Sequence, residues 1–384
     1  MKRFLLLIFF LSIVSFQNFS FAEESNERVI KSNRIDNYEI LSISQPGSLF
    51  YSVTNGIIKS AINLNSNLTF IGRANVGLEK VIDKNNIEIL TTRKDYLYSL
   101  SIKTIHNDVS DLFYSKEVSE SLINNEIIIS DLTANLYSLT KGDSMFLIGL
   151  NQQEVEVVVG EIIPDSEIGW FEGVVNKDLG YKLGINRNIQ AIIWGNKITE
   201  NHLIEIHKNI KYKKIRITGR DSTPNRNWVL PTALVKEMFG DFQIKERDGT
   251  WITIDRAWKD ENIETKNVPI LGKITCHRLM WEPLLGVFNQ IIEENLQSGL
   301  SREQYKEAGG CYAPRRINRF DSGGSISRHA WGIAIDINTK TGYKPRIVEI
   351  FNDWGFAWGG TWTSPDAMHF ELRSLSASIS QANK

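Results

Sequence analysis

The segment SRHAWGIAID, residues 327–336, alternates as a β-strand does when one of its faces is buried. Successive side chains of a strand point to opposite faces, so three isoleucines are expected to face a core: Ile333, Ile335 and Ile337. Gly332, Ala334 and Asp336 then share the other face, where two very small side chains leave open space beside a carboxylate. His329 precedes the strand. Because seven extended residues would span about 23 Å, the chain must bend if His329 and Asp336 are to bind one ligand.

A second segment, DAMHFE at residues 366–371, shows the same division into an apolar and a polar face. Its apolar side chains, together with the residue that follows, alternate as a core face: Met368, Phe370 and Leu372. His369 and Glu371 therefore project together on the opposite face, and Asp366 lies in the turn before the strand. Each of the two segments thus presents groups that can bind a metal, opposite an apolar face.

Two histidines and one carboxylate that leave a fourth position open form a ligand set typical of catalytic zinc. His329, His369 and Asp336 are the candidates in this chain. Zinc lowers the pKa of a bound water toward about 7 and polarises a scissile carbonyl. A nearby carboxylate must then carry the proton of the water to the leaving amine, and Asp366 is placed for that role. Glu371 is expected to orient a ligand or the substrate.

The two segments match the patterns Ser-x-His-x-x-Gly-x-Ala-x-Asp and Asp-x-x-His-Phe-Glu. In these patterns the chain resembles the D-alanyl-D-alanine carboxypeptidase and L-alanyl-D-glutamate endopeptidase family of zinc peptidases. The resemblance covers roughly residues 221–376, and most clearly 305–373. It implies one zinc ion, with Asp366 as general base and acid and with three protein ligands: His329, Asp336 and His369.

The family resemblance also implies an upstream arginine that holds a carbonyl or carboxylate of the substrate. The corresponding stretch here is GCYAPRR, residues 310–316, which makes Arg315 the first candidate and Arg316 the second. Ser327 is a further candidate for a hydrogen bond to the substrate, although a serine at this place can equally form a turn.

The substrate implied by the resemblance is a peptidoglycan stem peptide, and the bond that is cleaved stays open. The chain has Asp366 where some family members have glutamate, which resembles the endolysin-like branch more than the dipeptidase branch. A D-alanyl-D-alanine carboxypeptidase is the favoured activity, and an L-alanyl-D-glutamate endopeptidase is the alternative. The rival from another class is a non-catalytic cell-wall-binding protein with a structural zinc. No His-Glu-x-x-His motif is present to support a different zinc peptidase class.

The N-terminus has the pattern of a secretory signal peptide. Lys2 and Arg3 precede an apolar run at residues 4–16, and Ser20 and Ala22 stand at positions −3 and −1 of a cleavage site. The run is shorter than the roughly 20 residues that span a bilayer. We therefore predict a signal peptide at 1–22, no membrane span in the mature chain, and secretion to the cell wall or periplasm.

The chain has two cysteines, Cys276 and Cys311, both in its last third. An even number of cysteines in an exported protein suggests a disulfide. Such a bridge would stabilise the fold by roughly 3 kcal/mol in the chain-entropy model. The alternative is metal binding by Cys276 together with its neighbour His277.

The patterning predicts an α+β protein, and a length of 384 residues predicts two or three folded units. Residues 23–220 are β-rich, show no sustained helical period and contain several clear strand patterns: 127–129, 145–150, 155–163 and 189–194. Residues 221–376 are expected to combine a small antiparallel sheet with a hairpin around residues 248–249 and three flanking helices: 231–238, 283–296 and 345–354. Residues 377–384 form a tail.

The charge balance speaks against nucleic acid as a partner. The chain has 44 basic and 45 acidic residues, so its formal net charge is −1, and no basic stripe stands out. The region 23–220 carries no recognisable chemistry, and a binding module for glycan or for a partner is one possible role for it. The sequence does not indicate an oligomeric state.

Overall fold

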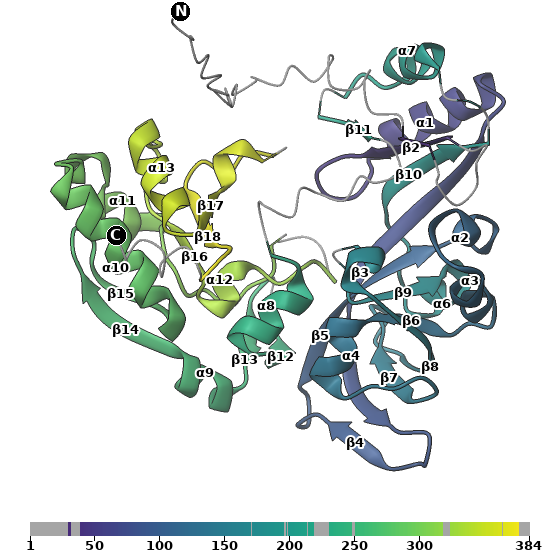
Figure 1. The fold of residues 1–384 in the computed structure, drawn as a ribbon, viewed down its shortest axis with the longest axis horizontal. Coiled ribbons are helices and arrows are strands. Elements are labelled where there is room, and N and C mark those ends of the chain that lie inside the picture. Colours follow the sequence, from purple (N-terminus) through teal and green to yellow (C-terminus); the bar gives the residue numbers. More distant parts are fainter. Residues whose placement is uncertain are drawn as a thin grey trace, which may run out of the picture.

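The structure is a computed structural model that describes residues 30–31, 39–169, 171–195, 197, 199–212, 214–218, 230–247, 250–317, 323–362 and 364–375. The first half of these residues and the second half lie on opposite sides of the molecule (Figure 1). The predicted signal peptide, the turn at 248–249 and the tail at 377–384 lie outside the described residues. Within the described ranges, no helix combines the length and apolar character needed to cross a membrane.

The first half is built around a closed ring of six strands. Each strand pairs with the next, and the last pairs with the first: β3 (Asn67–Ile82), β7 (Ser144–Ile148), β8 (Glu154–Ile163), β6 (Ile127–Ser130), β9 (Gly173–Asn176) and β5 (Leu97–Ile105). The β6–β8 and β5–β9 pairs are parallel, and the other four are antiparallel. Closure leaves none of these strands as a free edge over its paired length.

Strand β3 extends the ring into an outer sheet. Its first residues pair with β10 (Asn188–Trp194), which pairs in turn with β2 (Glu39–Ser44). Strands β1 (Ile30–Lys31) and β11 (Arg216–Thr218) both pair with β2, and β4 (Glu88–Thr91) pairs with the far end of β3. Strand β3 therefore belongs both to the closed ring of six strands, which is a barrel, and to the outer sheet.

This half contains helices although its sequence shows no sustained helical period, and its β-rich character and all four strand patterns are confirmed. Seven helices lie among its described residues: α1 (Tyr51–Asn63), α2 (Asn107–Phe113), α3 (Lys116–Ile123), α4 (Asp131–Tyr137), α5 (Asp165–Ile168), α6 (Lys177–Lys182) and α7 (Glu200–Asn209). Most of them span two turns or fewer. The buried face of α1 includes Gly56 and Ser60, which are not hydrophobic and therefore interrupt the apolar pattern that would predict a helix. Gly56 is required there because a Cβ would approach the carbonyl oxygen of Asn209 to 2.6 Å.

The second half is the predicted small antiparallel sheet with flanking helices. Strand β18 (His369–Leu372) lies between β16 (Ala334–Asp336) and β17 (Phe356–Trp358), antiparallel to both. A second hairpin pairs β14 (Ile263–Val268) with β15 (Gly272–His277). The helices of this half are α8 (Thr232–Phe239), α9 (Arg256–Asn262), α10 (Trp281–Glu293), α11 (Arg302–Ala308), α12 (Arg328–Trp331) and α13 (Pro345–Asp353). The three predicted helices correspond to α8, α10 and α13.

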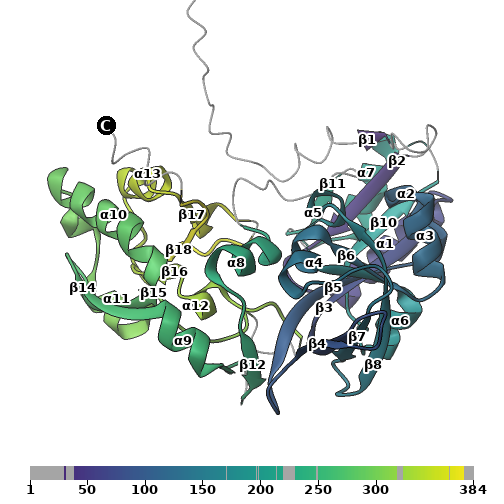
Figure 2. The same cartoon turned by 60° about the horizontal axis from the view of Figure 1, so that its bottom comes forward.

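The two halves are joined by backbone hydrogen bonds between strands and by packed side chains. Strand β12 (Gln243–Glu246) pairs with barrel strand β5 on one side and with β13 (Ile252–Ile254) on the other. Helix α8 packs against α4 of the barrel (Figure 2). Hydrophobic clusters nevertheless remain separate, since one cluster runs from Leu230 to Leu372 and the others lie between Ile40 and Ile217.

Candidate metal centre

A single helical turn makes the bend that the spacing of His329 and Asp336 requires. Ser327 caps α12, and its Oγ accepts a hydrogen bond of 3.3 Å from the backbone N–H of His329. Gly332 ends the helix in the left-handed region at φ +69°, where a Cβ would also approach the backbone nitrogen of His277 to 2.7 Å. Glycine is the residue that adopts this conformation without steric cost. The chain then enters β16, which ends at Asp336.

The register of β16 against β18 brings the two motif segments together. Asp336 is directly opposite His369, and Ala334 is directly opposite Glu371. Residues that face each other across an antiparallel pair project from the same face of the sheet. The polar face predicted for each segment is therefore one shared face. Ile333, Ile335 and Ile337 are fully buried on the other side, as the alternation predicts.

Three side chains converge on one point. The Nε2 of His329 lies 3.2 Å from Nδ1 of His369 and 3.2 Å from a carboxylate oxygen of Asp336. The other oxygen of Asp336 lies 3.0 Å from Nδ1 of His369. All three residues are buried, and their potential ligand atoms lie within 4.8 Å of one another. Two imidazole nitrogens and a carboxylate in this arrangement suit a zinc ion.

Each histidine uses its other ring nitrogen for a hydrogen bond that fixes the ring. Nδ1 of His329 lies 2.9 Å from the backbone carbonyl oxygen of Cys311, and Nε2 of His369 lies 3.3 Å from a carboxylate oxygen of Glu371. Partners of this kind orient metal-binding histidines and make the ligating nitrogen more basic. They leave Nε2 of His329 and Nδ1 of His369 for the metal. The contact of Glu371 agrees with its predicted orienting role.

The charges of the cluster are strongly coupled. Burial opposes ionisation of Asp336, yet its hydrogen bonds with His329 and His369 outweigh burial and hold the pKa of the carboxyl well below its usual range. Burial also opposes the charge on His369, but the hydrogen bonds with Asp336 and Glu371 raise the pKa of the imidazole to about 9. The protein environment therefore favours positive charge at the point where a metal ion would sit.

Asp366, the predicted general base, lies at the rim of this cluster. It is half-buried, and its backbone carbonyl accepts a hydrogen bond of 3.2 Å from the backbone N–H of His369. Gly359 packs against both residues, since a Cβ at Gly359 would lie 3.3 Å from the Cβ atoms of Asp366 and His369. The loop after β17 therefore holds Asp366 beside the candidate metal ligands.

The two candidate arginines have different surroundings. Arg316 is buried and already bound, because its Nε donates to Glu246 at 3.2 Å and its guanidinium also donates to the backbone carbonyl of Gly324. Arg315 is half-buried, and within the part of the chain that the structure describes its guanidinium has no hydrogen-bond or ion-pair partner. Of the two, Arg315 is the one whose charge remains available to a substrate.

The cysteines form the predicted disulfide, so the alternative of metal binding by Cys276 and His277 is wrong. Cys276 and Cys311 are bonded, with Cα atoms 5.3 Å apart. His277 is fully buried, and burial lowers the pKa of its imidazole to about 4. Its Nδ1 accepts a hydrogen bond from the backbone N–H of Leu279, and its Nε2 lies 3.2 Å from the backbone carbonyl oxygen of Phe239. Both ring nitrogens of His277 are thus used within the fold.

One residue beside the site was not found by motif reasoning. The ring centroid of Trp362 lies 5.2 Å from that of His369. The indole N–H of Trp362 is buried, and no hydrogen-bond partner for it exists among the described residues. The aromatic run FAWGGTW at residues 356–362, just before the second motif, is the signal that could have indicated it.

Residues 321–372 match the family model described as D-alanyl-D-alanine carboxypeptidase. The C-terminal region thus carries a segment of this peptidase family. The match contains both motif segments and confirms the family resemblance over residues 321–372. A search of curated proteins finds no match to the chain.

Proposed function

We propose that this chain is an exported zinc peptidase that hydrolyses peptidoglycan stem peptides, with D-alanyl-D-alanine carboxypeptidase activity favoured. The observation that carries the proposal is the buried convergence of His329, Asp336 and His369 inside the segment that matches a peptidase family. The predicted signal peptide supports export. A disulfide between Cys276 and Cys311 suits an oxidising compartment.

The residues around the cluster supply what peptide hydrolysis needs. His329, Asp336 and His369 would hold a zinc ion, which would supply Lewis-acid chemistry by polarising the peptide carbonyl and lowering the pKa of water toward about 7. Asp366 accepts a proton from the attacking water and passes it to the nitrogen of the leaving amine as the C–N bond breaks. Arg315 binds a carboxylate or carbonyl of the substrate through its guanidinium. Glu371 holds the His369 ring in the orientation in which Nδ1 is free for the metal.

The first experiment measures release of D-alanine from a synthetic pentapeptide that ends in D-Ala-D-Ala. Release by the wild type should stop with a chelator and return with zinc. Asp366→Asn should lower kcat by about 10²- to 10⁴-fold and leave the zinc content unchanged, because the base is lost and the ligands remain. Asp111→Ala removes an exposed carboxylate on α2 of the barrel half and serves as the matched control.

The identity of the released product separates the two peptidase activities. Free D-alanine identifies a carboxypeptidase. Fragments cut between L-alanine and D-glutamate, with no D-alanine release, identify an endopeptidase, an outcome that Asp366 in place of glutamate would suit. Zinc binding without cleavage of the pentapeptide or of purified sacculi would refute the enzymatic proposal in favour of a cell-wall-binding protein.

A further inference from the structure

A narrow three-stranded sheet of single β-bridges lies beside the candidate metal centre. Its middle segment pairs with one segment on each side, and the three segments are residues 250–252, 314–317 and 325–327. Trp251 is directly opposite Arg315, and Arg316 is directly opposite Ile326. The second pairing sets Arg315 opposite Ser327, whose backbone N–H donates to the Arg315 carbonyl at 3.0 Å. Because residues that face each other across antiparallel strands project from the same face, Trp251, Arg315 and Ser327 form one row.

Burial alternates between the two faces of this narrow sheet. The face opposite the row is packed into the protein, with four buried side chains: Thr250, Ile252, Arg316 and Ile326. On the face of the row, Trp251 is 47% exposed and Arg315 is half-buried. Ile317, two residues after Arg315 on the same face, is 61% exposed. The row therefore lies on a face that is open to solvent at its outer end.

The inner end of the row adjoins the candidate metal ligands. Ser327 caps α12 and precedes His329 by two residues. The middle segment is tied to the same place, because the backbone N–H of Ala313 donates to the carbonyl of His329 at 2.9 Å. Neighbouring strands lie about 4.8 Å apart, so Trp251 is about 10 Å from Ser327 along the row. That distance corresponds to about three residues of an extended peptide.

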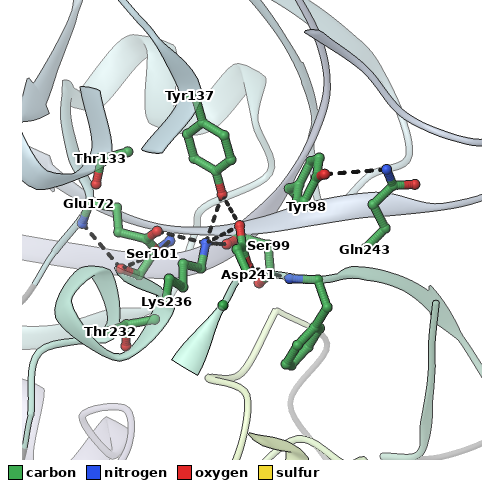
Figure 3. A network of polar contacts seen from close by, with 12 residues as sticks. Tyr98, Ser99, Ser101, Thr133, Tyr137, Glu172, Thr232, Lys236, Asp241 and Gln243 are labelled. Carbon is green, nitrogen blue, oxygen red and sulfur yellow. Dashed lines mark hydrogen bonds and ion pairs between the residues drawn. The ribbon is translucent and has the colours of Figure 1, made fainter. Parts of the chain in front are cut away.

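The first half of the molecule holds Trp251 in place. Trp251 directly precedes β13, whose partner β12 pairs with barrel strand β5. Gln243 of β12 is directly opposite Tyr98, and its side-chain amide donates to the Tyr98 hydroxyl at 3.4 Å. Figure 3 shows this contact near the buried ion pair of 2.7 Å between Lys236 and Glu172. An element fixed to the barrel thus presents an exposed aromatic ring close to the metal centre of the other half.

The chemistry of the row suits an anionic peptide. The guanidinium of Arg315 has no partner among the residues that the structure describes, so its charge is available to a carboxylate. Trp251 and Ile317 place exposed apolar surface on either side of that charge. An aromatic ring with one open side offers a large contact area to an aliphatic group. Positive charge between two apolar side chains is complementary to a carboxylate with aliphatic neighbours.

We propose that Trp251 is a specificity-determining residue that packs against the substrate peptide about three residues from the cleaved bond. Arg315 holds an acidic group of the peptide between Trp251 and the metal centre. A carboxypeptidase has only one substrate residue on the C-terminal side of the cleaved bond, so the part that reaches Trp251 is N-terminal to that bond. The inference rests on the proposed peptidase function, and it assigns to the barrel half the role of presenting a substrate-binding residue.

The test compares release of D-alanine from a pentapeptide and from a tripeptide that both end in D-Ala-D-Ala. Trp251→Ala should lower kcat/KM for the pentapeptide about tenfold, mainly through KM, because exposed tryptophans that become buried on binding carry large contributions. The loss for the tripeptide should stay within about twofold, since this peptide ends short of Trp251. Trp251→Phe should restore most of the preference for the longer peptide, and the zinc content of both variants should equal that of the wild type.

Tyr51→Ala, which removes an exposed aromatic side chain at the start of α1, is the matched control and should change neither peptide. Equal losses on both peptides, or no loss on the pentapeptide, would overturn the assignment of Trp251 while leaving the peptidase intact. A loss seen only when the pentapeptide carries its disaccharide would likewise overturn it, in favour of a sugar contact.

Failure of the proposed function gives a different result. If the wild type releases D-alanine from neither peptide, the carboxypeptidase proposal fails, and calorimetric binding of the uncleaved peptides decides on Trp251. Tighter binding of the pentapeptide that Trp251→Ala abolishes supports the inference. Equal affinities for the two peptides, or no binding of either, refute it.

Discussion

Two buried clusters of charged side chains differ in where their positive charge comes from. At the junction of the halves, Lys236 supplies a cation to Glu172 and Asp241, at 2.7 and 3.4 Å. At the metal centre, the carboxylates of Asp336 and Glu371 hydrogen-bond only to histidines among the described residues. The first cluster contains its own lysine cation, whereas the second gains a full cation only by protonation or by binding a metal.

The difference separates a structural role from a functional one. The environment of the junction raises the pKa of Lys236, because the nearby Asp241 and Glu172 outweigh the effect of burial. The lysine therefore stays charged, while burial raises the pKa of the Asp241 carboxyl beside it. In the candidate metal centre the ligand atoms converge with no lysine or arginine between them among the described residues, so a metal ion can take that place. A buried cluster whose carboxylates face only imidazoles among the described residues is the better candidate for a metal site, because metal ions bind imidazole and carboxylate ligands.

The largest effect is expected from breaking the metal centre itself. His369→Ala should abolish zinc binding and reduce peptidase activity by about 10³-fold or more, since a catalytic metal contributes several kcal/mol to transition-state stabilisation. Zinc content and D-alanine release measure the two effects. His207→Ala on α7 of the first half is the matched control. Full activity of His369→Ala after dialysis against a chelator would contradict the assignment of this ligand.

Breaking the ion-pair network at the junction of the two halves should lower the stability of the protein. Lys236→Met leaves Glu172 and Asp241 buried without their cation and should lower the free energy of unfolding by about 3–5 kcal/mol. Urea unfolding measures the change. Adding Glu172→Gln to Lys236→Met should recover part of the loss because one uncompensated charge disappears. A loss below about 1 kcal/mol in the single variant would show that the network is not desolvated as the structure indicates.

A third buried group, His277, has no charged hydrogen-bond partner and should give the unfolding free energy a pH dependence. Its pKa of about 4 in the fold lies below the ordinary 6.5, so the unfolded chain binds a proton first as the pH falls. The contribution of neutral His277 to the free energy of unfolding is complete above pH 6.5. It declines between pH 6.5 and 4, by up to about 3 kcal/mol. Denaturant titrations at pH 7 and 4.5 measure it. His277→Asn should flatten this part of the profile, and an unchanged slope would contradict the shift.

The smallest effect concerns Glu371. Glu371→Gln keeps the shape of the side chain and a hydrogen-bond acceptor for His369, but it removes the charge, so zinc affinity should fall by about 10- to 100-fold. Competition with a zinc-binding dye measures the affinity. The variant should still bind zinc at saturating concentration, in contrast to His369→Ala. A complete loss of zinc would make Glu371 a direct ligand.

The candidate metal centre could be predicted from the sequence because both of its segments are short and alternate strictly between apolar and polar or small residues. Alternation predicted the faces of β16 and β18, and the need for a bend was met by α12 and Gly332. The cross-strand register of Asp336 against His369 could not be predicted, because it depends on pairing between segments 33 residues apart.

The first half was predicted less completely. Local patterns indicated four of its strands, β6, β7, β8 and β10, but closure into a ring is set by long-range pairings such as β3 with β5 that leave no local signal. Its helices are short or bury small polar residues, so they lack an apolar period. The junction network was equally hidden, since nothing near Lys236 in the sequence indicates that it meets Glu172 across the molecule.

The turn at Gly332 has a consequence for how this motif varies in length. One helical turn and a left-handed glycine carry the chain from His329 to Asp336 with no slack. A single inserted residue there would rotate the histidine away or shift β16 to its opposite face. Between Asp336 and His369 the chain instead passes through α13, β17 and surface loops, where extra residues can bulge outward. Relatives of this chain should therefore have the same number of residues between the positions of His329 and Asp336, whereas the number between Asp336 and His369 should vary.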